Sequence, residues 1–275
     1  MNKTILVTVV ALIALSRQDV LSMNRQDRTG KIPSLKSLPQ EISGEIKEEL
    51  ARDRSFLEKE LESFLAAAKL FNDRPPAEQT DAEYEALQKR RARYIAAARE
   101  FNEKVSTIQR RFEFDQLLND PARRFTPINA PDTNIQGDRE AWKYAGVINQ
   151  FRVDVSRRYE QEGEKTWCNI FVWDITRAMN VEIPLQTTAE MVRWLKDTGA
   201  KQGWRRVSID AAQREANKGN PTVAIMAGHA AVVRPGSPGR EDGSAVAQAG
   251  AIVVNASHLK KRFGDSSLVE FWSHE

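Results

Sequence analysis

The sequence is poor in the side chains that most often carry chemistry. Its 275 residues include one cysteine, Cys168, and only three histidines, His229, His258 and His274. A single cysteine cannot form an internal disulfide, and histidines without close spacing do not make a typical zinc site. A G-x-G-x-x-G fingerprint and a P-loop are also absent. We therefore predict no metal ion and no other cofactor.

The chain also lacks a large net charge of either sign. Its 41 basic and 38 acidic side chains leave a net charge of +3, which gives no indication of a nucleic-acid partner. The 41% of hydrophobic and 29% of charged residues are typical of a soluble globular protein. At roughly 100–200 residues per domain, the length predicts one or two domains.

One apolar run opens the chain, and it is too short to cross a bilayer, which takes about 20 residues. It covers Ile5 to Leu15 and follows Lys3, and Ala14-Leu15-Ser16 offers small residues at positions −3 and −1 of a cleavage site before Arg17. This pattern predicts a signal peptide over residues 1–16 and hence an extracytoplasmic protein, either periplasmic or secreted. Two alternatives stay open, namely an uncleaved segment that tethers the protein weakly to a membrane and a buried N-terminal helix.

A long helical pattern follows a polar stretch, residues 17–40, which we expect to be a flexible linker. Apolar residues then recur at intervals of seven or four, with three more widening the stripe: Ile46, Leu50, Leu57, Phe64 and Phe71, with Leu61, Leu65 and Ala68. The two prolines of NDRPPAEQ end this first helix.

A second long helix is expected to begin after those prolines. Thr80 and Glu83 fit a capping box, and apolar residues at heptad-like spacing follow as far as Phe112. We therefore predict an α-helical hairpin, similar to a coiled coil, over residues 41–118. Its charged side chains are expected to face solvent, among them Arg90, Arg91, Arg93 and Glu100.

The second half of the chain changes character. Residues 119–138 are rich in proline, asparagine and aspartate, and we expect a second linker there. Short helices come next, with caps expected at Asp138, at Thr187 or Thr188, and at Ser208. Strand-like segments close the chain at residues 221–227, 229–235, 244–250, 251–255 and 268–274. Helices followed by an antiparallel sheet predict an α+β fold.

Cys168 is expected to open a helix that is capped by Thr166 and runs to Met179. Apolar residues lie on nearly every face of this helix, which predicts burial and favours a packing role for the cysteine. Its position in the first turn favours chemistry instead. There, backbone N–H groups and the helix dipole stabilise a thiolate and lower the pKa of the thiol. Cys168 is therefore the candidate nucleophile.

A thiol nucleophile needs a base, and His229 is the candidate because it begins a predicted strand of the core. His258 and His274 are expected to lie on the surface. A third polar group usually orients the base. Gln248, on the next predicted strand, is our candidate for this role, and Asn255 is the runner-up.

Three short motifs resemble, in this order, those of the papain-like cell-wall hydrolases of the CHAP and NlpC-type group: CNIFV (168–172), GHAAVV (228–233) and VAQAG with Gln248. The resemblance implies a papain-like domain over residues 139–275, with a buried cysteine-bearing helix packed on an antiparallel sheet. This chain departs from the family at Trp167, where an acidic residue is common, and at GNPTVAIMA, which lacks the usual Gly-Asp. Gln248 also stands where His, Glu or Asn is more common.

The resemblance implies an exported bacterial cysteine hydrolase that cleaves amide bonds in peptidoglycan, as a stem-peptide endopeptidase or an N-acetylmuramoyl-L-alanine amidase. Peptidoglycan or its peptide fragments would be the substrate, and the hairpin is expected to offer a surface to a protein partner. Two other functions stay open. One is a non-catalytic helical adaptor with an inactive papain-like domain, and the other is a cysteine acyltransferase or amidase acting on a different substrate.

Overall fold

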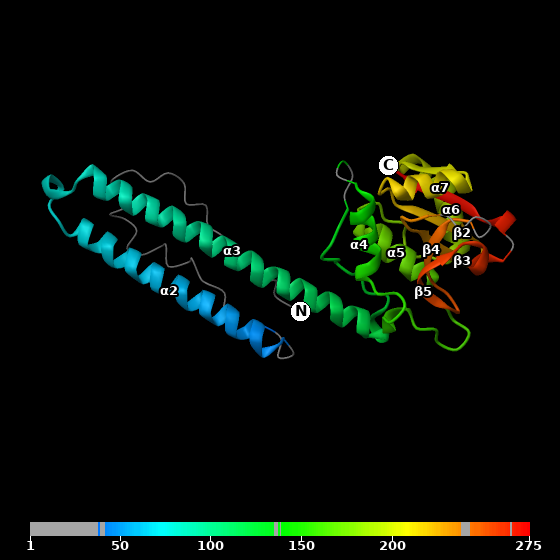
Figure 1. The fold of residues 1–275 in the computed structure, drawn as a ribbon, viewed down its shortest axis with the longest axis horizontal. Coiled ribbons are helices and arrows are strands. Elements are labelled where there is room, and N and C mark those ends of the chain that lie inside the picture. The colour runs from blue at the N-terminus through cyan, green and yellow to red at the C-terminus, as the bar shows by residue number, and fades with distance from the viewer. Residues whose placement is uncertain (1–37, 39–41, 135–136, 138, 238–242, 265) are drawn as a thin grey trace. The chain divides into compact units, whose positions relative to one another are not determined.

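The computed structural model describes residues 38, 42–134, 137, 139–237, 243–264 and 266–275 (Figure 1). The predicted signal peptide and most of the predicted linker at 17–40 lie outside these residues. The chain divides into two compact units, Met1–Phe112 and Glu113–Glu275, called unit 1 and unit 2 below. No helix in the described part is both long enough and apolar enough to cross a membrane.

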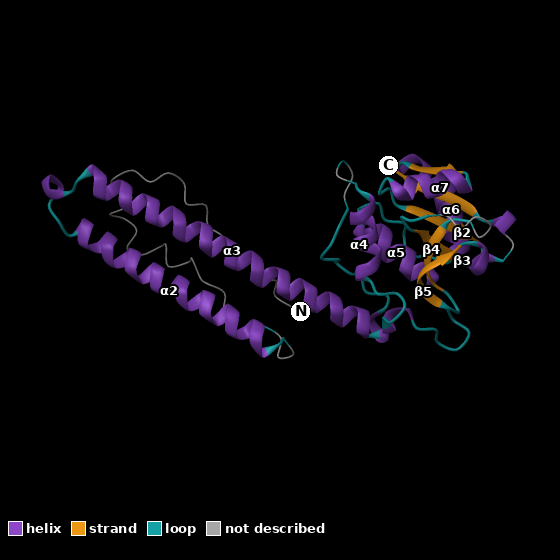
Figure 2. Ribbon diagram, in the orientation of Figure 1, coloured by secondary structure: helices purple, strands orange, loops and turns teal. Residues whose placement is uncertain are grey.

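Unit 1 contains the predicted helical hairpin, drawn as the long purple helices of Figure 2. Helix α2 covers Gly44–Asn72, a 3-10 turn η3 covers Pro76–Glu78, and helix α3 covers Asp81–Asn119, with its last turns in unit 2. The capping box is confirmed. The backbone N–H of Glu83 donates to the Thr80 hydroxyl at 3.3 Å, and the Thr80 N–H donates to the Glu83 carboxylate at 3.4 Å.

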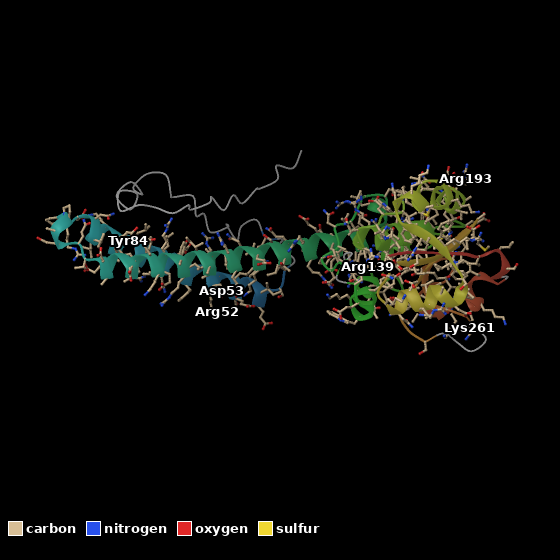
Figure 3. All side chains as sticks on the ribbon, turned by 90° about the horizontal axis from the view of Figure 1, so that it is seen from above. Arg52, Asp53, Tyr84, Arg139, Arg193 and Lys261 are labelled. Atoms are coloured by element: carbon tan, nitrogen blue, oxygen red, sulfur yellow. The ribbon has the colours of Figure 1, made fainter. Side chains whose placement is uncertain are left out.

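The interior of the hairpin follows the predicted stripe. Buried residues of α2 pack with buried residues of α3 in two clusters, and these include Leu50, Leu57, Phe64, Phe71, Leu87, Phe101 and Val105. Lys104 of α3 links the two helices, because it donates to Glu49 at 2.6 Å and to Asp53 at 2.7 Å, both on α2. Asp53 is labelled in Figure 3. The prediction for Leu65 was wrong, because this side chain is 50% exposed beside the stripe.

Arg91 also departs from the prediction of a solvated side chain. It is only 9% exposed, and its Nε and Nη2 atoms are buried without a partner among the described residues. The reason is its spacing, since it lies four residues after Leu87 and therefore on the same face of α3. It stands between the cluster of Phe64 and Leu87 and that of Leu57 and Phe101.

Unit 2 has the predicted α+β architecture. After a 3-10 turn, η4 (Pro121–Arg123), the helices are α4 (Ala141–Gln150), α5 (Cys168–Ala178), α6 (Thr188–Asp197), α7 (Ile209–Asn217) and α8 (Lys260–Phe263), with further 3-10 turns η5 (Arg157–Tyr159), η6 (Gly199–Gln202) and η7 (Ser266–Leu268). The strands are β1 (Trp204–Val207), β2 (Thr222–Met226), β3 (His229–Val233), β4 (Ala245–Ala249), β5 (Val253–His258) and β6 (Glu270–His274). They form one antiparallel sheet in the order β1-β6-β2-β3-β4-β5.

Helix α5 lies against the two strands that bear His229 and Gln248. Helix α5 packs against β3 and β4 (Figure 1), and its apolar residues join those strands in the large core of unit 2. Small residues such as Ala230, Ala231 and Ala247 are fully buried there. Because alanine side chains are short, the helix and sheet backbones can approach closely.

Segments before the sheet also build the core of unit 2. Residues 119–138, expected as a linker, contribute the buried residues Arg124, Ile128 and Asn134. Helix α4 has Glu140 as its N-cap instead of Asp138, which lies outside the described residues. Thr187 and Ser208 cap α6 and α7 as predicted.

Candidate active site

Cys168 is the first residue of α5, as the sequence predicts. The N-cap residue is Trp167 and not Thr166, and its side chain makes no capping hydrogen bond. The first backbone N–H groups of α5 are therefore not used by a side-chain cap. The thiol instead faces the N–H groups of Cys168, Asn169 and Ala230 and the hydroxyl of Thr166, all of which lower its pKa.

Burial of the thiol raises its pKa by more than these contacts lower it. Cys168 is only 4% exposed, and this burial raises the pKa of the thiol above its ordinary value. The expectation of a lowered thiol pKa was therefore wrong, because the dipole argument neglects the loss of hydration around the sulfur. The resting thiol keeps its proton near neutral pH.

His229 begins β3 directly after a two-residue turn, Ala227–Gly228, that joins β2 to β3. The turn requires φ = +94° at Gly228, which favours glycine. The N–H of Gly228 donates to the Thr188 hydroxyl at 2.8 Å, so the start of α6 holds this turn. Thr188 and Gly228 thus determine where the strand begins and where the imidazole lies.

Gln248 contacts His229 from the neighbouring strand β4. Its Oε1 atom lies 2.8 Å from Nε2 of the His229 ring, while its Nε2 atom donates to the Ile252 carbonyl at 3.0 Å. Since the amide nitrogen must face the carbonyl, the amide oxygen must accept a hydrogen bond from the Nε2–H of the ring. This fixes the tautomer with hydrogen on Nε2 and leaves Nδ1 as the basic nitrogen.

The His229 ring is closely surrounded. The ring of Phe263 lies 4.6 Å away between centroids, and a Cβ atom on Gly250 would come within 3.0 Å of the His229 Cε1 atom. Burial lowers the pKa of His229 from its ordinary 6.5, and the contact with Gln248 acts in the opposite direction. The imidazole is therefore neutral at neutral pH, which is the form that a general base needs.

The fold brings some of the candidate residues together and leaves Asn255 apart from them. Cys168 and His229 lie on packed elements, and the thiol adjoins the backbone of Ala230, but no hydrogen bond between the thiol and the imidazole occurs in the part of the chain described. Asn255 lies elsewhere: its amide donates to Asn149 at 3.0 Å, and its carbonyl accepts from Arg234. The runner-up therefore does not contact the base.

The other two histidines lie apart from the candidate base. His258 is on the edge strand β5 and is partly exposed, opposite Ala245. His274 was expected on the surface but is 9% exposed, because β6 pairs with β1 and carries it into the fold. Its ring nitrogens lie 2.7 Å from the carbonyls of Gln202 and Glu275.

Sequence reasoning missed a polar cluster beside the nucleophile. The guanidinium of Arg124 lies 4.1 Å from the centre of the Trp167 ring, and its Nη1 atom donates to Glu162 at 2.9 Å. Phe125 meets the same tryptophan edge-on, with 5.8 Å between the ring centroids. The local signal was the Trp167 next to Cys168, but its partners come from a stretch that resembles a loop.

Sequence reasoning also missed a buried ion pair that joins α5 to η5. Arg158 and Asp174 are fully buried and form two hydrogen bonds at 2.7 and 2.9 Å, and the Tyr159 hydroxyl donates to Asp174 at 2.7 Å. Burial raises the pKa of Asp174, while Arg158 and Tyr159 act in the opposite direction. The signal was present, since Asp174 is the one acidic residue of α5, a helix that has apolar residues on nearly every face. The pair anchors the helix that carries Cys168.

No protein-family model matches the sequence, and neither does any curated protein. The described residues contain no group of three or more His, Cys, Asp or Glu side chains that could hold a metal ion. What remains is a buried thiol at an uncapped helix start, next to a strand that begins with an oriented imidazole. Such an arrangement is suited to nucleophilic attack on a carbonyl carbon with a histidine as the proton carrier.

Proposed function

We propose that residues 139–275 form a papain-like cysteine hydrolase domain that cleaves amide bonds in peptidoglycan outside the cytoplasm. The observation that carries this proposal is the imidazole of His229. Its Nε2–H is held by Gln248, its Nδ1 is basic, and the strand that it opens packs against the helix that begins with Cys168.

In this proposal Nδ1 of His229 takes the proton of the Cys168 thiol as the sulfur attacks the carbonyl carbon of the amide. The N–H of Cys168 donates to the oxyanion, and His229 then gives the proton to the leaving amine, which leaves a thioester. Water attacks the thioester and gives its proton to His229. The carboxylic acid departs as the thiol regains its proton.

The pKa shifts at the site agree with this order of events. The thiol pKa is raised and the His229 pKa is lowered, both by burial, so the resting pair is neutral. The proton therefore moves during the attack and not before substrate binds. General-base assistance of this kind contributes about 10²- to 10⁴-fold to a rate.

The substrate follows from the resemblance of CNIFV and GHAAVV to the cell-wall hydrolases and from the predicted signal peptide. A direct experiment incubates purified sacculi with the full chain and identifies the soluble products by mass spectrometry. An amidase separates glycan strands from whole stem peptides, whereas an endopeptidase cuts within the peptides. The absence of any soluble product at high protein concentration would exclude peptidoglycan as the substrate.

A further inference from the structure

The residue before the nucleophile is part of a buried cationic cluster. Arg124 follows η4, is only 4% exposed, and places its guanidinium on the ring of Trp167, the N-cap of the helix that begins with Cys168. Within the described ranges its guanidinium makes one hydrogen bond, from Nη1 to Glu162. The Glu162 side chain is 72% exposed. A desolvated cation thus depends on a single, largely solvated carboxylate.

Two donors of this cluster have no acceptor in the part of the chain that the structure describes. Nε of Arg124 and Nε1 of Trp167 are both buried without a hydrogen-bond partner among the described residues. A buried unpaired donor is destabilising, so such groups are uncommon unless a ligand or water supplies the acceptor. The planar guanidinium carries five N–H groups in a geometry that matches a carboxylate with two parallel hydrogen bonds. Arg124 therefore has an N–H group without an acceptor among the described residues, beside the ring of the residue that precedes the nucleophile.

We propose that Arg124 and Trp167 form a subsite for a carboxylate of the substrate, and that this carboxylate takes the place of Glu162 on the guanidinium. The inference rests on the proposed hydrolase function and specifies its substrate class: peptides with a free carboxylate close to the scissile amide. Because Glu162 is itself a carboxylate, it already shows which chemical group Arg124 donates to.

The surroundings of the subsite allow this exchange. Glu162 lies in a tight turn closed by backbone hydrogen bonds with Lys165, and Gly163 supplies the left-handed residue at φ = +59°. The exposed side chain of Glu162 can therefore rotate into solvent while the turn stays intact. Phe125, which is 60% exposed and edge-on to Trp167, offers an apolar wall for the neighbouring part of the peptide.

The test uses the full chain with Cys168→Ala, so that bound peptide is not consumed. Two synthetic stem tetrapeptides are compared by calorimetry; they differ only in whether the α-carboxylate of the glutamate is free or amidated. We expect the free acid to bind at least tenfold more tightly than the amide. Adding Arg124→Gln should abolish this ratio, whereas Arg123→Gln, a matched change at the exposed neighbouring arginine, should preserve it. Equal affinities, or a ratio that survives Arg124→Gln, would overturn the subsite.

A second variant keeps the test decisive if Arg124→Gln does not fold. Glu162→Gln removes the competing carboxylate from an exposed position, so the acid peptide should bind several-fold more tightly while the amide peptide is unaffected. No gain for the acid peptide would overturn the exchange. Cleavage by the unmodified chain separates the two proposals. Cys168-dependent cleavage without acid preference rejects only the subsite, whereas acid-selective binding without cleavage rejects only the hydrolase.

Discussion

At the scale of single residues, the candidate base depends on a glycine as much as on its polar partner. Gly250 lies just after β4, and an added Cβ would meet the His229 ring at 3.0 Å and the Gln248 amide nitrogen at 3.4 Å. The missing side chain thus leaves room for the hydrogen bond between them. The sequence alone offers no sign of this role, because it follows from the pairing of β3 with β4.

Gly250→Ala should therefore displace the imidazole by a few tenths of an ångström. We expect kcat/KM to fall between about 3- and 10-fold, since catalytic groups tolerate little misplacement. Steady-state kinetics on a peptide substrate measures this. Gly146→Ala is the control, because no atom lies within 4 Å of its added Cβ. Equal kinetics for the two variants would show that the His229 position does not matter for the reaction.

The pH dependence of activity belongs to the same scale. Burial lowers the pKa of His229 below 6.5, and the base works only when neutral. Activity is thus retained as the pH falls through 6.5 and is lost only at more acidic pH, where the folded protein takes up the proton. The acid limb of kcat/KM should lie below pH 6.5. A limb above that value would contradict the assignment of His229 as a buried base.

Gln248→Glu supplies an independent check on this limb. A carboxylate beside the ring favours the imidazolium, which raises the pKa of His229. The acid limb should then move to higher pH than in the unmodified chain. An unmoved limb would mean that residue 248 does not interact with the group that limits the rate in acid.

At the scale of elements, the hairpin contains a polar interruption. Arg91 divides the two apolar clusters and leaves two buried donors without described partners. Buried ionic groups are often destabilising relative to apolar side chains of similar volume, yet they can select one register of paired helices. We interpret Arg91 in this way, as a residue that limits stability at the centre of the hairpin.

Arg91→Met should consequently stabilise the hairpin by about 1–3 kcal/mol. Hydrogen exchange along α2 and along the part of α3 that belongs to unit 1, residues 81–112, measures this locally. The neighbouring Arg90→Met is the control, because Arg90 is partly exposed and donates to Ser63 at 2.6 Å. This change should leave protection unchanged or slightly reduced. Faster exchange in Arg91→Met would instead indicate an acceptor for Arg91 outside the described residues.

Elements that follow periodic patterns could be predicted from the sequence. The heptad stripe led to α2 and α3, and the alternation after Gly219 led to β2 through β6. Strand β1 was missed because its four residues, WRRV, are too few and too polar to indicate a strand. It exists because β6 supplies a partner for its backbone. Pairing of distant segments is not a local property, so local patterns do not contain it.

In the candidate site, too, local motifs could be predicted from the sequence and contacts between distant segments could not. Cys168, His229 and Gln248 could be chosen because each occupies a definite position in a local motif. The cluster of Arg124 and Trp167 joins residues 43 positions apart and has no motif. The direction of the thiol pKa was also beyond reach, because burial of the sulfur is a property of the folded unit. Contacts and desolvation require the three-dimensional structure, whereas helix starts and strand starts do not.

At the scale of the whole molecule, the chain combines a helical hairpin with an α+β unit that carries the candidate site. Helix α3 belongs to both, since its residues Phe114, Leu117 and Leu118 pack in the core of unit 2. The expected protein partner of the hairpin, the export of the chain and the papain-like activity stay predictions. Among them, the activity is the central claim.

The most direct test of that claim compares fragment release from purified sacculi by the full chain and by Cys168→Ala. The substitution removes one sulfur atom from a buried site, and matched thermal unfolding of the two proteins establishes that the fold is intact. We predict that the unmodified chain releases soluble peptide-containing fragments and that Cys168→Ala reduces release to the background. Undiminished release by Cys168→Ala would contradict the account.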